Sequence, residues 1–119
     1  MKYVDGFVLA VPEKNLPAYW RMARTAGKIW RAHGALDYKE CVGDDLQVAM
    51  GLPFPKRMRT RPDETVVFSY IVFKSRAHRD RVNARVMKEP RLAASCDPAK
   101  PPFALKRMSY SGFQVRVDA

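Results

Sequence analysis

The chain has 119 residues, of which 47% are hydrophobic and 11% aromatic, and this composition predicts one folded domain over residues 1–119. It excludes wholesale disorder, and no apolar run reaches the roughly 18 to 20 residues that a membrane-spanning helix needs. The 22 lysines and arginines against 12 acidic residues give a net charge of +10, which attracts anionic partners.

The first segment predicts a strand over residues 3–11 that is apolar on both faces. Side chains alternate across a strand, so Phe7 shares a face with Asp5, whereas Val4 and Val8 point the other way. A strand that is apolar on both faces belongs in the middle of a sheet. The segment has no signal-peptide cleavage site, so we expect a cytoplasmic protein.

An amphipathic pattern predicts a helix from Asn15, a good N-cap, to the His33-Gly34 pair. The predicted apolar line of this helix is Leu16, Trp20, Ala23, Gly27 and Trp30. Glycine in the middle of a helix costs about 1 kcal/mol relative to alanine. We therefore expect the helix to approach the sheet closely at Gly27.

The next segments predict an edge strand, a long connection and a second central strand. Residues 35–42 carry three charges, which suit an edge strand because they prevent unwanted pairing. Residues 43–63 form a long connection with a basic cluster, of a kind that is commonly either a functional lid or partly disordered. Residues 64–73 (ETVVFSYIVF) are apolar on both faces, so they form the other central strand.

The remaining residues predict a second helix and a second edge strand. Ser75 is a suitable N-cap, Pro90 stops the helix, and residues 107–117 alternate in character along a strand. The element order β-α-β-β-α-β predicts an α+β ferredoxin-like sandwich, with a four-stranded antiparallel sheet in the order 4-1-3-2. Right-handed crossovers place both helices on one face of that sheet.

The opposite face of the predicted sheet keeps the apolar side chains of the two central strands. An exposed apolar patch of several hundred Å² marks an interaction site. We therefore expect two sheets to pack face to face in a two-fold homodimer.

Four segments carry a family resemblance and together cover most of the chain: YVDGFVLAVP (3–12), WRAHGALDYKECVGDD (30–45), PDETVVFSYIVFKSRAHRDRVNARVMKEPR (62–91) and KRMSYSGFQVRVDA (106–119). The chain resembles the YbaA-like family, small bacterial proteins of unknown function. The resemblance implies a dimeric α/β-barrel fold related to antibiotic-biosynthesis-type monooxygenases and stress-responsive barrel proteins. The chain departs from the family pattern at Ala104, where an acid is expected, and at Ser111, where glycine is expected.

Polar side chains on otherwise apolar strands are the candidates for a small-molecule site. Five of them could line the space between the sheet and its partner: Asp5, Tyr38, Glu40, Tyr70 and Tyr110. An apolar cleft with a few convergent polar groups is the usual form of such a site. Asp5 is open to two interpretations, as a general base or as a buried carboxylate paired with an arginine.

Two histidines complete the candidates. His33 closes the first helix, where a protonated imidazole is favourable, and His78 begins the second. An imidazole titrates near neutrality and can act in catalysis. The sequence favours a structural role for both.

The sequence predicts no metal site and no cofactor. Cys41 and Cys96 are far apart with no Cys-x-x-Cys spacing, so we expect free thiols in a reducing compartment. There is no His/Cys cluster for a metal, and the six scattered glycines make no phosphate-binding loop.

Three function classes follow from these observations. The second apolar face, the positive charge and the long connection favour a small-molecule-binding or stress-related module, with a small anionic or aromatic ligand. The alternative, by fold analogy, is a cofactor-independent monooxygenase or isomerase. RNA binding is favoured least, because the charges follow solvated helix faces and the strands lack an RNP-type aromatic motif.

Overall fold

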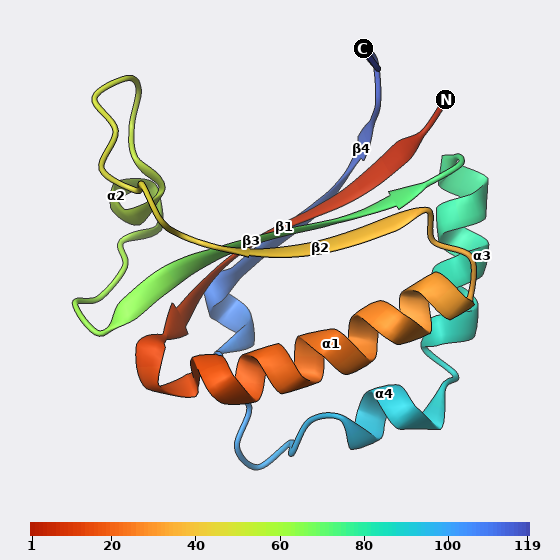
Figure 1. The fold of residues 1–119 in the computed structure, drawn as a ribbon, viewed down its shortest axis with the longest axis horizontal. Helices are drawn as coiled ribbons and strands as arrows, with labels where there is room; N and C mark the ends of the chain where they lie inside the picture. The colour runs from red at the N-terminus through yellow and green to blue at the C-terminus, as the bar shows by residue number, and fades with distance from the viewer.

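In the computed structural model, which describes residues 1–119, four strands form one antiparallel sheet (Figure 1). The strands are β1 (Tyr3–Pro12), β2 (Asp37–Val42), β3 (Glu64–Phe73) and β4 (Met108–Gln114). Their order across the sheet is β2-β3-β1-β4, which is 4-1-3-2 read from the other edge. The predicted ferredoxin-like topology, with β1 and β3 central, is therefore confirmed.

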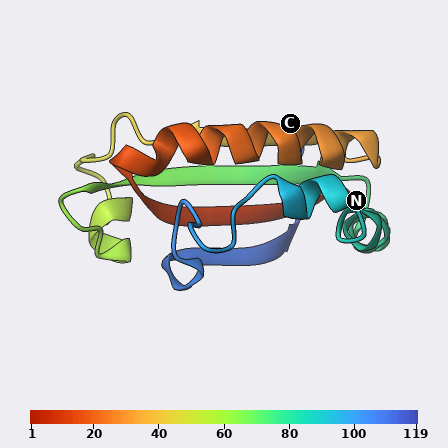
Figure 2. The same ribbon diagram turned by 90° about the horizontal axis from the view of Figure 1, so that it is seen from below.

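The helices gather on one side of the sheet. They are α1 (Leu16–Ala32), α2 (Phe54–Met58), α3 (Arg76–Val86) and α4 (Pro90–Ala94), with short 3-10 turns at Glu13–Asn15 and Leu105–Arg107. Figures 1 and 2 show α1 running along the sheet, α4 beside it under the same face, and α3 across one end. Only α2 lies elsewhere, at the other end of the sheet and beyond its opposite face. No helix combines the length and the apolar character that crossing a membrane requires.

The two predicted N-caps behave differently. The Ser75 hydroxyl accepts a hydrogen bond from the backbone N–H of His78, as expected of an N-cap. Asn15 makes no such cap, because the 3-10 turn before α1 already gives its backbone a helical conformation. Its side-chain amide instead donates to the carbonyl oxygen of Pro102, at 3.1 Å, and ties α1 to the segment after α4.

The core lies between the helices and the inner face of the sheet. Its two clusters of buried side chains are Leu9, Val11, Tyr19, Ala23 and Val67, and Ile29, Ala35, Ile71, Phe73, Val82 and Val86. The buried line of α1 is thus Tyr19, Ala23, Ala26 and Ile29, which lies beside the predicted line. Trp20 and Trp30 flank it and are half-buried.

The other face of the sheet, called here the open face, has no helix over most of its length (Figure 1). Val4, Val8, Phe68 and Phe113 surround a shallow apolar hollow on it. The Phe68 and Phe113 side chains are large and yet 43% and 57% exposed. The prediction that the central strands are apolar on both faces is confirmed.

Candidate functional site

An apolar cavity of about 300 Å³, called here the α1 cavity, lies between α1 and the inner face of the sheet. Its walls come from α1, three strands and the segment that follows α4: Met22, Ala26, Trp30, Phe7, Leu9, Ile71, Met108, Leu92 and Phe103. The volume and the apolar lining are those of a small-molecule site.

Glu40 is the one carboxylate in the wall of the α1 cavity. The hydroxyl of Tyr19 donates to its Oε1 atom at 2.8 Å, and the hydroxyl of Tyr38 donates to its Oε2 atom at 2.7 Å. Ser69 lies directly across from Glu40 on β3 and is buried in the same wall. Each carboxylate oxygen therefore accepts a hydrogen bond from one phenol, and with Ser69 as a third donor the carboxylate keeps one of its roughly four lone-pair sites.

Strand alternation and one glycine put these groups in place. Tyr38 and Glu40 are two residues apart on β2, so both side chains face α1, whereas Lys39 between them faces the open side. A Cβ atom on Gly27 would lie only 3.0 Å from the Cδ1 atom of the Tyr38 ring. The expected close approach of the helix at Gly27 is confirmed, and its partner is Tyr38.

The surroundings of Glu40 shift the pKa values of all three groups. Burial raises the pKa of Glu40, although hydrogen bonds from Tyr38, Tyr19 and Ser69 partly oppose this rise. Burial, with the neighbouring Glu40 charge, also raises the pKa values of Tyr19 and Tyr38 far above that of a free tyrosine. Both phenols are therefore protonated at neutral pH and act as donors.

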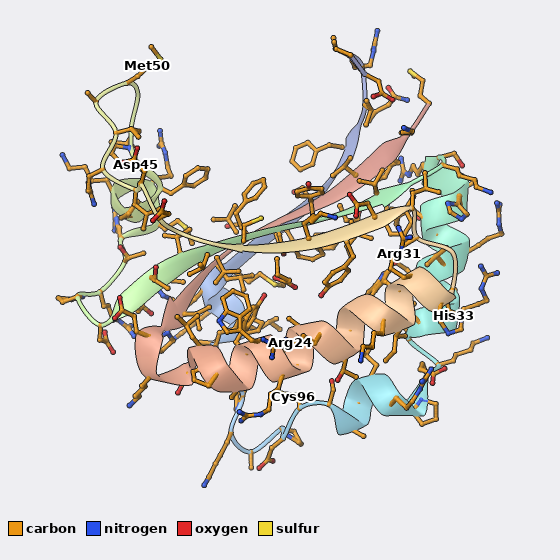
Figure 3. The ribbon with its side chains drawn as sticks, in the orientation of Figure 1. Arg24, Arg31, His33, Asp45, Met50 and Cys96 are labelled. Carbon is orange, nitrogen blue, oxygen red and sulfur yellow. The ribbon has the colours of Figure 1, made fainter.

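A second hollow, called here the basic groove, has a volume of about 460 Å³ and lies between α1 and the β2 edge. Arg24, Lys28 and Arg31 line it, and it reaches Tyr38 and Glu40. Figure 3 shows Arg24 and Arg31 on the side of α1 that faces the sheet. No ion pair forms at any of these three cations, so their charge is free to attract an anion.

Asp5 belongs to a separate buried network. It is 1% exposed, and its Oδ1 atom accepts a hydrogen bond at 2.8 Å from the Nη1 atom of Arg79. Asn83 donates to its Oδ2 atom at 3.3 Å, and the same Arg79 nitrogen donates to the hydroxyl of Tyr110. The guanidinium also lies over the ring of Tyr3. This geometry matches the interpretation of Asp5 as a buried carboxylate paired with an arginine. The network of hydrogen bonds joins β1, α3 and β4.

The predicted strand candidates divide between the two faces of the sheet. All five are candidates, from the sequence, for the space between the sheet and a partner. Only Tyr70 lies on the open face, beside Phe68. Tyr38 and Glu40 line the α1 cavity, while Asp5 and Tyr110 lie on the same inner face but outside the cavity. The placement in the intersheet space is therefore corrected for these four, because α1 and α3 pack on the face that carries them.

Neither histidine lies at the α1 cavity. The Nε2 atom of His33 is 3.5 Å from the Glu89 carboxylate, beyond the end of α1. His78 is buried, and its Nδ1 atom accepts a hydrogen bond from the backbone N–H of Lys74. Burial lowers the pKa of His78, and nearby cations lower it further.

Sequence reasoning missed Tyr19 and Ser69 as members of the site. Tyr19 lies next to the predicted apolar line of its helix, and its hydroxyl, which needs a polar partner when buried, was the available signal. Ser69 is a small hydroxyl residue in the middle of a mostly apolar central strand, a position that a buried polar partner on the neighbouring strand would explain.

Comparison with known proteins places the chain in a family. Residues 2–105 match the model of a family described as a protein of unknown function (DUF1428). The chain belongs to this family. It is 38% identical over 118 residues to the uncharacterized protein YbaA of Escherichia coli, with 99% of each chain covered, and equally similar to YbaA of Shigella flexneri. The resemblance to the YbaA-like family is confirmed.

Solved structures share the fold of this family member. One is a crystal structure of a mutant of SnoaB, a cofactor-independent oxygenase from Streptomyces nogalater, with a TM-score of 0.59 and 12% identity. That match covers 98% of this chain and 95% of the other. The de novo designed protein Foldit4 matches with a TM-score of 0.50 and 11% identity, over 98% of this chain and 100% of the other. At these identities the likeness shows the fold alone.

Proposed function

We propose that this protein binds a small molecule with an aromatic body and an anionic group, at the junction of the α1 cavity and the basic groove. The observation that carries the proposal is the position of Glu40 and Tyr38, which line both hollows. A ligand lying across this junction would place its ring among apolar side chains and its anion beside Arg24 and Lys28.

The two hollows supply different parts of the binding energy. Burying an aromatic ring in the α1 cavity is favourable by about 25 cal/mol for each Å² of apolar surface removed from water. The cations of the basic groove are exposed, so they contribute mainly to the choice of ligand and to the rate of encounter. This division explains how the net charge of +10 could serve recognition of a small anion.

We also propose that the protein is a homodimer joined through the open face. Phe68, Tyr70 and Phe113 present contiguous apolar surface there, and no helix of the same chain covers most of it, since α2 reaches only Phe68, through Phe54. Apolar surface of this kind is removed from water when two sheets pack face to face.

The two free cysteines suit a reducing compartment, and we propose that the protein is located in the cytoplasm.

The fold shared with SnoaB supports a second candidate function, a cofactor-independent monooxygenase or isomerase. The specific observation in its favour is the buried Glu40 carboxylate in an apolar wall, because such a group is a suitable proton acceptor.

Binding can be tested through the two tryptophans. Trp20 lines the basic groove and Trp30 lines the α1 cavity, so their fluorescence should report a ligand in either. Benzoylformate, an aromatic 2-oxo acid, is the probe, and benzyl alcohol is its uncharged control. We expect saturable quenching by benzoylformate and much weaker quenching by the alcohol.

The cations of the basic groove are tested with a double variant. Replacing Arg24 and Lys28 by glutamine should weaken benzoylformate binding about tenfold, which is about 1.4 kcal/mol. The matched control replaces Arg81 and Arg85, exposed on α3 and away from both hollows, by glutamine. Equal affinities in the two double variants, or no saturable binding to the unmodified protein, would overturn the proposal.

A further inference from the structure

Glu40 is placed as a reacting group as well as a binding group. It stands where the α1 cavity meets the basic groove, and no other carboxylate lines either hollow. Two phenols hold its oxygens at 2.7 and 2.8 Å, one on each oxygen, so the carboxylate has a defined orientation. Even with Ser69 as a third donor, one of the roughly four lone-pair sites of the carboxylate remains for a group of the ligand.

We infer that the α1 cavity catalyses proton transfer at the carbon next to a carbonyl group, with Glu40 as the base, on small aryl 2-oxo acids. This inference rests on the proposed binding function and adds a reaction to it. The apolar walls support it, because a carboxylate that is poorly hydrated is a stronger base than one in water. The net reaction is keto–enol isomerisation.

The step balances within the groups present. The bond between the benzylic C3 atom and its hydrogen breaks, and the proton joins a Glu40 oxygen. The electron pair left on C3 forms a double bond to C2, and the π pair of the C2 carbonyl moves to its oxygen. The Tyr38 hydroxyl protonates that oxygen while Glu40 returns its proton to the Tyr38 oxygen. Both residues end as they began, and the product is the enol.

The surroundings of Glu40 bear on how the rate depends on pH. The titratable and charged groups near it are Tyr19, Arg24, Lys28 and Arg31 from α1 and Tyr38 from β2, with Cys96 in the cavity wall. Burial is the dominant influence on its pKa, which it raises above 4.5. The rate at which a bound 2-oxo acid exchanges its C3 hydrogens with water should therefore rise with pH to a plateau, with a midpoint above 4.5.

The experiment uses phenylpyruvate, which carries two hydrogens on C3, and measures their exchange in deuterated water by proton NMR. We expect exchange faster than in buffer alone with the unmodified protein. Glu40→Gln should lower the protein-dependent rate at least tenfold while fluorescence still reports binding. Glu13→Gln, at an exposed position before α1, is the matched control and should leave the rate unchanged. Circular dichroism checks that each variant is folded.

A second variant keeps the test decisive if Glu40→Gln does not fold. Tyr38→Phe leaves the carboxylate and removes the proton donor, so it too should slow exchange about tenfold. Binding of phenylpyruvate without exchange above the buffer rate would overturn the inference and leave the binding function in place. Unchanged exchange in a folded Glu40→Gln or Tyr38→Phe variant would also overturn it. Failure of the unmodified protein to bind either acid would overturn the binding function itself.

Discussion

Gly27 and Tyr38 are in contact across the gap between α1 and β2, where a Cβ atom on residue 27 would stand 3.0 Å from the tyrosine ring. This separation is tighter than ordinary van der Waals contact, so any larger side chain at position 27 must displace the ring. The ring carries the hydroxyl that holds Glu40, and it also packs near Trp30. The glycine thus sets the position of a phenol on the neighbouring strand.

Gly27→Ala should therefore separate stability from binding. Alanine is favoured over glycine in a helix by about 1 kcal/mol, and displacement of Tyr38 opposes this gain. We expect the free energy of unfolding to change by about 1 kcal/mol or less, while the affinity for benzoylformate falls severalfold. Denaturant titration and tryptophan fluorescence measure the two quantities. Unaltered affinity would show that the Tyr38 hydroxyl tolerates the shift.

Removal of the Arg79 charge should destabilise the protein strongly. Asp5 is 1% exposed and the Arg79 side chain 14% exposed, so Arg79→Met leaves a buried carboxylate whose remaining hydrogen-bond donors, Asn83 and Tyr110, are both uncharged. We expect a loss of about 3 kcal/mol in the free energy of unfolding, the lower end of the range for breaking a buried ion pair. Arg76→Met, exposed in the first turn of the same helix, is the control and should change it by less than about 0.5 kcal/mol. Similar losses in both variants would contradict a role for the pair.

A charge on the open face should abolish dimer formation. Phe68 is 43% exposed within one chain, so Phe68→Glu disturbs the fold little but places a carboxylate in the proposed interface. We expect the unmodified protein to sediment as a dimer at micromolar concentration and the variant as a monomer. Ala84→Glu, exposed on α3, should remain dimeric. A monomeric unmodified protein would refute the homodimer.

The raised pKa of Glu40 predicts a difference in stability that grows with pH. A carboxyl whose pKa is raised by folding stabilises the protein fully below its unfolded pKa, near 4.5, and this contribution is lost as the pH rises through the folded pKa. Glu40→Gln does not titrate. Its free energy of unfolding, relative to that of the unmodified protein, should therefore increase between pH 4 and pH 8. Denaturant titrations at several pH values measure this, and a constant difference would show that the pKa is unshifted.

His78 predicts the opposite dependence. Its pKa is lowered in the folded state by burial, so its contribution to stability is complete above about pH 6.5 and is lost as the pH falls. In His78→Asn, the asparagine oxygen can still accept the hydrogen bond that the Lys74 N–H now donates to the Nδ1 atom. Relative to the unmodified protein, this variant should gain stability between pH 7 and pH 5. An unchanging difference across that interval would rule out a buried neutral imidazole.

Periodicity was sufficient to predict the fold because the two central strands are apolar on both faces and the two edge strands are not. It was insufficient for the site, since alternation says which residues share a face but not which face the helices cover. Glu40 illustrates the limit. Its charge counted among those that suit an edge strand, yet the register with Ser69 turns it toward α1.

The cavity itself could not be predicted from strand and helix patterns. Part of its wall comes from Leu92 and Phe103, in and after a short helix where the chain follows no regular repeat. The Asn15 side chain, expected to cap a helix, instead bonds to the carbonyl of Pro102 in this segment. Contacts of this kind depend on the folded chain as a whole, so no local pattern in the sequence predicts them.

Neighbouring residues of β3 face two different environments. The Ser69 side chain lines the α1 cavity, while the side chains of Phe68 and Tyr70, on either side of it in the sequence, lie on the open face. One short stretch of chain therefore serves the proposed binding site and the proposed interface at alternate positions. Exchanging the inward residue should change what is bound without changing assembly, and exchanging an outward one should do the reverse.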